Sequence, residues 1–171
     1  MRALKLLAAL AAALLAHLFL VALLPPVARV LDPFLLAIAY TAMSGRVGWS
    51  ATSGAIVGLV HDALSGGLYG LHGFAGTAVA FVMARTARLV DLHKGYYVAL
   101  FFAASVILQQ LVLQGLLLLL MRRPELLALP DLALKAGLAA PLGALLVAAS
   151  ERLGESLGSW RSRRRAEIFL D

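Results

Sequence analysis

Long apolar stretches, separated by short charged loops, make up most of this chain. A segment inside a bilayer must satisfy its own backbone hydrogen bonds, so a spanning helix needs about 20 mainly apolar residues. The pattern predicts an all-α, polytopic membrane protein with about six transmembrane helices, residues 1–151, followed by a basic tail, residues 152–171. The predicted spans are residues 6–24, 33–43, 49–64, 71–84, 95–121 and 132–150.

The first two spans can be interpreted in more than one way. The basic start MRALK and the apolar stretch behind it have the layout of a signal peptide, but the stretch is long for one, so an uncleaved helix is expected. Pro25 and Pro26 end this helix, because proline lacks the backbone donor and clashes with the preceding turn. The second span is short, and with the third it could form a re-entrant hairpin instead.

Basic residues predict the orientation, because cytoplasmic loops of membrane proteins are rich in Lys and Arg. With six spans and a cytoplasmic N-terminus, eleven Lys and Arg residues fall inside, three fall outside, and Lys135 lies at the outer edge. Both termini are therefore expected in the cytoplasm. The net charge of +6 is explained by this distribution and not by nucleic acid, since the basic residues form no single patch with interleaved aromatics.

Several kinds of chemistry are missing from the sequence. The chain has no cysteine, which excludes disulfides, thiolate metal sites and cysteine nucleophiles. It contains no phosphate-binding loop and no H-E-x-x-H motif. His17, His61 and His72 are scattered and are expected to be packed or interfacial. The sequence predicts no enzyme, no cofactor and no metal site.

Ser50, Gly54, Gly58 and Asp62 recur every four residues in the third predicted span. At this spacing they share one face of a helix, and a small-x-x-x-small pattern lets two helix backbones approach closely in lipid. The fourth span carries two similar faces, one with Gly73 and Thr77 and one with Gly76, Ala80 and Ala84. The sixth span carries another, with Ala136, Ala140, Ala144 and Ala148. These faces are predicted to pack against other helices.

Asp62 is an acidic residue in an apolar span, and such residues are costly in a bilayer. In the first interpretation it accepts hydrogen bonds from the following turn, where Gly66 and Gly70 can take positive φ, or from the start of the next helix. In the second interpretation Asp62 forms an ion pair with Lys135, although Asp131, four residues before Lys135, could form that pair instead. A site for a coupling ion or proton is a third interpretation. A catalytic role is expected least, because no other acid lies inside a predicted span.

Polar side chains also occur in the fifth span, where Ser105, Gln109, Gln110 and Gln114 are spaced by four residues in pairs. Buried amides in membranes form hydrogen bonds between helices. These glutamines are therefore predicted to hold helices together or to contact the helix of a partner.

The tail combines basic residues with aromatic and aliphatic ones. Anionic lipid attracts basic residues near the membrane surface. The tail is therefore predicted to anchor the chain on lipid, or else to bind a cytoplasmic partner. The residues predicted to make these contacts are Trp160, Arg161, Arg163, Arg164 and Arg165.

The stretch GAIVGLVHDALSGGLYGLHGFAGTAVAFVMAR, residues 54–85, resembles the signature region of the rod-shape-determining protein MreD family. In that family a Gly-rich helix ends in Asp, and Ser-Gly, Leu-Gly and a further apolar helix follow. Leu68-Tyr69 and His61 depart from the usual pattern. The residues that match it are Gly58, Asp62, Ser65, Gly66 and Gly70.

The resemblance implies a non-enzymatic scaffold of the bacterial cell-elongation complex, located in the inner membrane and supporting lateral peptidoglycan synthesis. It implies a bitopic MreC-like partner, proximity to MreB and to RodA with its transpeptidase, and a two-plus-two complex if the partner dimerises. It also implies a fold similar to the six-helix substrate-binding subunits of energy-coupling-factor transporters.

Two functions are therefore weighed. In the scaffold hypothesis, the small-residue faces and the glutamine-bearing helix form a groove for the partner's transmembrane helix, and Gly58→Leu weakens that contact. In the alternative, the chain is the small-molecule-binding membrane subunit of a transporter, with an outward-facing pocket near Asp62. The few convergent polar groups nearby count against the alternative.

Overall fold

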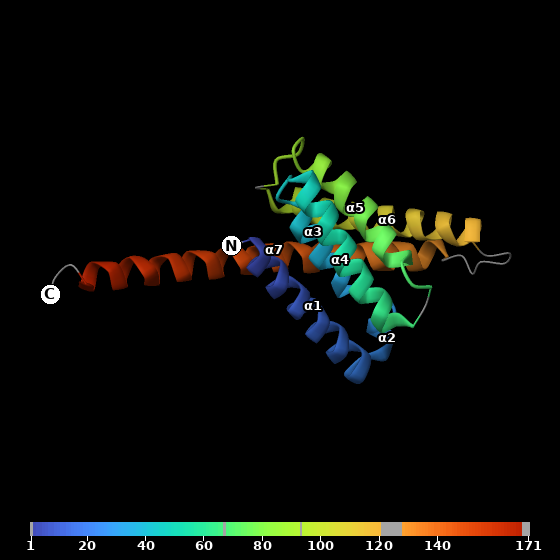
Figure 1. Ribbon diagram of the computed structural model, residues 1–171, viewed down its shortest axis with the longest axis horizontal. Coiled ribbons are helices and arrows are strands. Elements are labelled where there is room, and N and C mark those ends of the chain that lie inside the picture. The colour runs from blue at the N-terminus through green and yellow to red at the C-terminus, as the bar shows by residue number, and fades with distance from the viewer. Residues whose placement is uncertain (1, 67, 93, 121–127, 169–171) are drawn as a thin grey trace.

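The structure is a computed structural model that describes residues 2–66, 68–92, 94–120 and 128–168. These residues form helices and contain no strand (Figure 1), which confirms the all-α prediction. The helices are α1 (Arg2–Leu23), α2 (Pro25–Ala28), α3 (Pro33–Ala42), α4 (Val47–Ser65), α5 (Leu71–Thr86), α6 (Gly95–Leu120) and α7 (Leu129–Ile168).

Three helices in the described ranges are long and apolar enough to cross a membrane. They contain the segments Leu6–Leu23, Gly95–Leu120 and Leu129–Arg152. Helix α3 is apolar but has only 10 residues. Helices α4 and α5 are less apolar than α3, because they carry Gly, Ser, Thr and His residues. The number of six spans and the cytoplasmic position of both termini stay predictions.

Helix α3 lies at the centre of the bundle, which explains how so short a helix can be so apolar. It contacts α1, α4, α5, α6 and α7, and residues 33–39 are all buried. Phe34 and Ala39 are completely inaccessible to solvent. A helix that is apolar on every side is typically enclosed by other helices, so α3 serves as the core around which the longer helices pack.

The other helices form two closely packed pairs, α4 with α5 and α6 with α7. Gly143 of α7 lies against the ring of Phe102 in α6, with no room for a Cβ atom. Helix α1 packs mainly on α3 and lies at the outside of the bundle (Figure 1). Most of its large side chains are exposed, which is the expected environment for a helix surrounded by lipid.

Helix α7 does not end where the predicted tail begins. Its 40 residues include Pro141 and continue to Ile168, beyond the rest of the bundle (Figure 1). The basic tail is therefore helical in its backbone. Its predicted lipid or cytoplasmic contacts lie outside the part of the chain whose side chains the structure describes, namely Trp160, Arg161, Arg163, Arg164 and Arg165.

Candidate functional site

The small-residue face of α4 packs directly against α5. Ser50, Gly54, Gly58 and Asp62 are all buried. A Cβ atom on Gly54 would collide with the backbone carbonyl of Gly76, and a Cβ on Gly58 would collide with the backbone of α5 at His72. The predicted close approach of helices is therefore confirmed, and it occurs between neighbouring helices of the same chain.

This contact changes the interpretation of the partner groove. Because α5 already covers Gly54 and Gly58, a partner's helix cannot reach them unless α4 separates from α5. In this structure the face is used within the chain, and docking of a partner on it stays a prediction; sequence alone cannot tell an internal helix contact from an external one. Gly58→Leu would disrupt the chain's own packing first.

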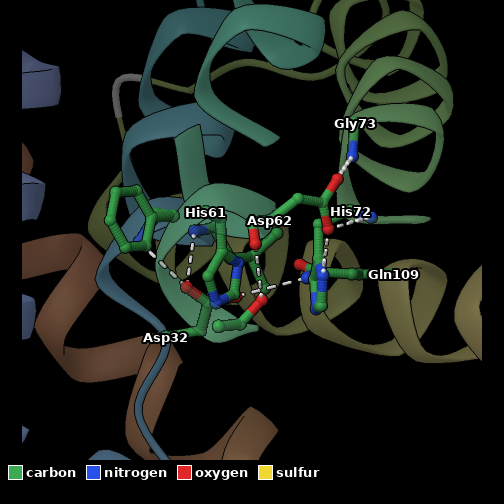
Figure 2. Close-up of polar contacts among 9 residues, drawn as sticks. Asp32, His61, Asp62, His72, Gly73 and Gln109 are labelled. Carbon is green, nitrogen blue, oxygen red and sulfur yellow. Dashed lines mark hydrogen bonds and ion pairs between the residues drawn. The ribbon is translucent and has the colours of Figure 1, made fainter. Parts of the chain in front are cut away.

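The carboxylate of Asp62 points from the end of α4 toward the start of α5 (Figure 2). Its Oδ2 accepts hydrogen bonds from the backbone N–H groups of Gly70 and Gly73, both at 3.0 Å. Its Oδ1 accepts from the backbone N–H of His72 at 3.0 Å and lies 2.8 Å from Nδ1 of the same residue. One carboxylate therefore satisfies three backbone donors that the first turn of a helix leaves unpaired.

These contacts decide between the interpretations of Asp62. The first, hydrogen bonding to the turn and to the next helix, is confirmed. The negative charge also lies at the N-terminus of α5, where the helix dipole favours it. The proposed pair with Lys135 is not formed, because the oxygens of Asp62 are occupied by α5 and no ion pair joins these two described residues.

The turn residues take the conformations expected of them. Gly66 ends α4 with φ of 63° and Gly70 precedes α5 with φ of 94°. This left-handed region strains residues that have a Cβ atom. The Ser65 hydroxyl donates to the carbonyl of Asp62 at 3.3 Å. Ser65, Gly66 and Gly70 therefore shape the turn that brings three backbone donors to Asp62.

A second carboxylate, Asp32, lies close to this network, although no role was predicted for it. Its Oδ1 caps α3 by accepting from the backbone N–H groups of Phe34 and Leu35 at 2.9 and 3.2 Å. Its Oδ2 accepts from Gln109 Nε2 of α6 at 3.2 Å and lies 3.8 Å from His61 Nδ1 of α4. Asp32 followed by Pro33 is a helix-start signal that could have identified the cap.

Two histidines, His61 and His72, connect the two carboxylates in space (Figure 2). The ring of His61 stacks on Phe34 at 4.8 Å and lies 4.2 Å from the ring of His72, measured between centroids. His17 of α1 is 6.0 Å from His61. Residues that are scattered along the sequence thus meet in space, and their predicted packing is confirmed. Within the described ranges they form no group suited to a metal ion.

The polar residues of α6 have different roles. Gln109 is 6% exposed and bonds across helices to Asp32, as predicted, while its Oε1 has no hydrogen-bond partner. Ser105 bonds within its own helix, to the carbonyl of Phe101 at 2.8 Å. Gln110 and Gln114 are half-buried, and their side chains form no hydrogen bond with other residues in the described part of the chain.

An open pocket of about 210 Å³ borders this network. Its walls come from α1, from the linker before α3, and from α4, α5, α6 and α7. The polar and charged residues of the wall are His17, Arg29, Asp32, His61, His72, Gln109, Gln110 and Lys135. Helix packing thus brings together polar groups that are up to 118 positions apart, as between His17 and Lys135.

The comparisons with known proteins agree with the signature in residues 54–85. The family model of the rod shape-determining protein MreD matches residues 2–145 of the chain. No match was found among curated proteins or among solved structures, so the likeness to transporter subunits stays a prediction. The matched residues include α1 to α6 and the first part of α7, up to residue 145, and the chain therefore belongs to the MreD family of rod shape-determining proteins.

Proposed function

We propose that this chain is a non-enzymatic membrane scaffold of the bacterial cell-elongation complex. It binds an MreC-like bitopic protein and so supports lateral peptidoglycan synthesis near MreB and RodA with its transpeptidase. Family membership supports a role in rod shape. The observation that carries the scaffold role is the engagement of Asp62 by the turn and by α5.

A reaction at Asp62 would require a carboxylate that is free to exchange protons or to attack a substrate. Asp62 is 3% exposed, and both of its oxygens accept hydrogen bonds from the chain itself. Withdrawing it would leave three backbone donors without a partner, at a cost of about 1–3 kcal/mol each. Asp62 therefore acts as a structural brace between α4 and α5.

The partner's transmembrane helix needs a surface other than the α4 face, and α6 offers one. Leu111 and Leu118 are 63% and 58% exposed, and Gly115 between them has open space around its Cα. Beside them, the side-chain amide of Gln114 has no hydrogen bond within the described residues. An amide at a helix surface in lipid gains from a partner across a helix interface, so we infer that the partner's helix crosses α6 at Gly115.

The test is affinity purification of the tagged full-length chain from native membranes in mild detergent, with mass spectrometry of the proteins recovered. Wild type should recover a bitopic protein with one transmembrane helix and a coiled coil. Gly115→Leu should lower that recovery severalfold. Gly137→Leu is the matched control, because Gly137 on α7 also has open space around it, and it should retain the partner.

Three outcomes would contradict the proposal at different levels. Recovery of nucleotide-binding subunits in place of the bitopic protein would favour the transporter alternative. Recovery of no partner from native membranes would contradict the scaffold role. Equal recovery by Gly115→Leu and wild type would leave the scaffold in place but would reject the α6 surface.

A further inference from the structure

The pocket beside the Asp62 network has an excess of positive charge and several polar groups without partners. The side chains of Arg29, Gln110 and Lys135 line it and form no hydrogen bond or ion pair with other residues in the described ranges. From this lining we propose that the pocket binds a phosphate group that carries a free hydroxyl, of the kind found in the headgroup of an anionic glycerophospholipid.

The charges of the wall select an anion. Arg29 and Lys135 each carry one positive charge, and Asp32 is the acidic residue of the lining. Both oxygens of Asp32 are already engaged, by the first amides of α3 and by Gln109. The positive end of the α3 dipole offsets part of its charge. The two cations therefore remain available to a phosphate, which Lys and Arg bind through charge-assisted hydrogen bonds.

The neutral polar groups account for the hydroxyl. Gln109 lines the pocket and is almost fully buried, yet its Oε1 lacks a donor among the described residues. A phosphate diester alone offers acceptors and no donor. A hydroxyl next to the phosphate supplies the donor that Gln109 lacks, and it can also accept from the amide of Gln110. Phosphate and hydroxyl together therefore match the wall better than phosphate alone.

The volume and surroundings favour a headgroup over a larger solute. A space of 210 Å³ holds about seven waters, at about 30 Å³ each. Pockets for drug-sized molecules usually measure about 300–1,000 Å³. Helix α1, which borders the pocket, exposes large apolar side chains to the outside, including Leu18 and Phe19. Acyl chains can lie against these surfaces while the headgroup occupies the pocket.

Native mass spectrometry of the full-length chain, titrated with single lipids of equal acyl chains, tests the proposal. Phosphatidylglycerol should bind at least several times more tightly than phosphatidylcholine. It should also bind more tightly than phosphatidylmethanol, which has the same phosphate diester but no hydroxyl. Competition by free sn-glycerol 3-phosphate distinguishes the source: displacement of the lipid would point to a soluble phosphate ester, and its absence to a lipid.

Matched variants locate the binding. Lys135→Gln should lower the affinity for phosphatidylglycerol about fivefold, the factor that follows from removing one basic residue near an anionic headgroup. Lys94→Gln removes the same charge from an exposed lysine outside the pocket and should leave the affinity unchanged. Gln109→Ala should abolish the preference over phosphatidylmethanol, whereas Gln114→Ala, on the same helix, should preserve it.

Circular dichroism checks that each variant is folded before its binding is compared. Equal affinity for phosphatidylglycerol and phosphatidylcholine would overturn the proposal. So would an equal loss in Lys94→Gln and Lys135→Gln, because the attraction would then come from the overall charge. Equal affinity for phosphatidylglycerol and phosphatidylmethanol would overturn the assignment of the hydroxyl.

Discussion

Replacing Asp62 should show how strongly one side chain holds α4 and α5 together. In Asp62→Ala, the N–H groups of Gly70, His72 and Gly73 lose their acceptor, and so does Nδ1 of His72. Each hydrogen bond to a charged group contributes about 1.5–3 kcal/mol. Water entering the vacated space recovers part of this. We expect Asp62→Ala to lower the free energy of unfolding by about 4–6 kcal/mol.

Asp62→Asn should fall between alanine and wild type. The amide keeps one oxygen, which can still accept from Gly70 and Gly73, the two donors that now share Oδ2. Its NH₂ group then faces the N–H of His72, where Oδ1 stood, so one backbone bond is lost together with the charge. The expected loss is about 2–3 kcal/mol, since a hydrogen bond to a charged group is worth about that much.

The free energies can be measured by unfolding the purified chain in mixed micelles with increasing dodecyl sulfate, followed by far-ultraviolet circular dichroism. Asp131→Asn is the matched control, because Asp131 is an exposed carboxylate in the first turn of α7. Its loss should cost less than about 1 kcal/mol. A result for Asp62→Ala within about 1 kcal/mol of wild type would refute the role of Asp62 as a brace.

Two further substitutions test the packing and the cap with the same unfolding measurement. Gly58→Ala places a methyl group against the backbone of α5 and should lower the free energy of unfolding by about 1–3 kcal/mol. Its control is Gly137→Ala, where space is open, which should be neutral or slightly stabilising. Equal effects of the two substitutions would contradict the close approach of α4 and α5. Asp32→Ala removes the cap of α3 and the acceptor of Gln109 and should cost about 1–2 kcal/mol, so an unchanged stability would show that the cap is dispensable.

The hydrophobic pattern correctly predicted where helices form. Runs of apolar residues require helical backbone in lipid, and Gly and Pro mark their ends, so α4, α5 and α6 begin and end within a few residues of the predicted spans. The turn after Asp62 was also predictable, because glycine adopts positive φ readily. Gly66 and Gly70 both have positive φ in the structure. The local chemistry of Asp and Gly is sufficient for such assignments.

The partners of each helix face were not predictable. A stripe of small residues such as Gly54 and Gly58 indicates a close contact but does not name the neighbour, and here the neighbour is α5 of the same chain. The segment that begins at Pro33 was expected to be a short span or part of a re-entrant hairpin. Its position at the buried centre of the bundle was not expected.

The sequence by itself determined that the chain is helical and apolar, that it carries the MreD signature, and that a glycine-containing turn with Gly66 and Gly70 follows Asp62. These properties depend on residues close together along the chain. Only the tertiary structure brought Asp32, His61 and Gln109 into contact and formed the pocket beside them. The physical reason is that such contacts depend on how helices pack and cross, and the residue pattern of a single helix does not specify which helix it will contact.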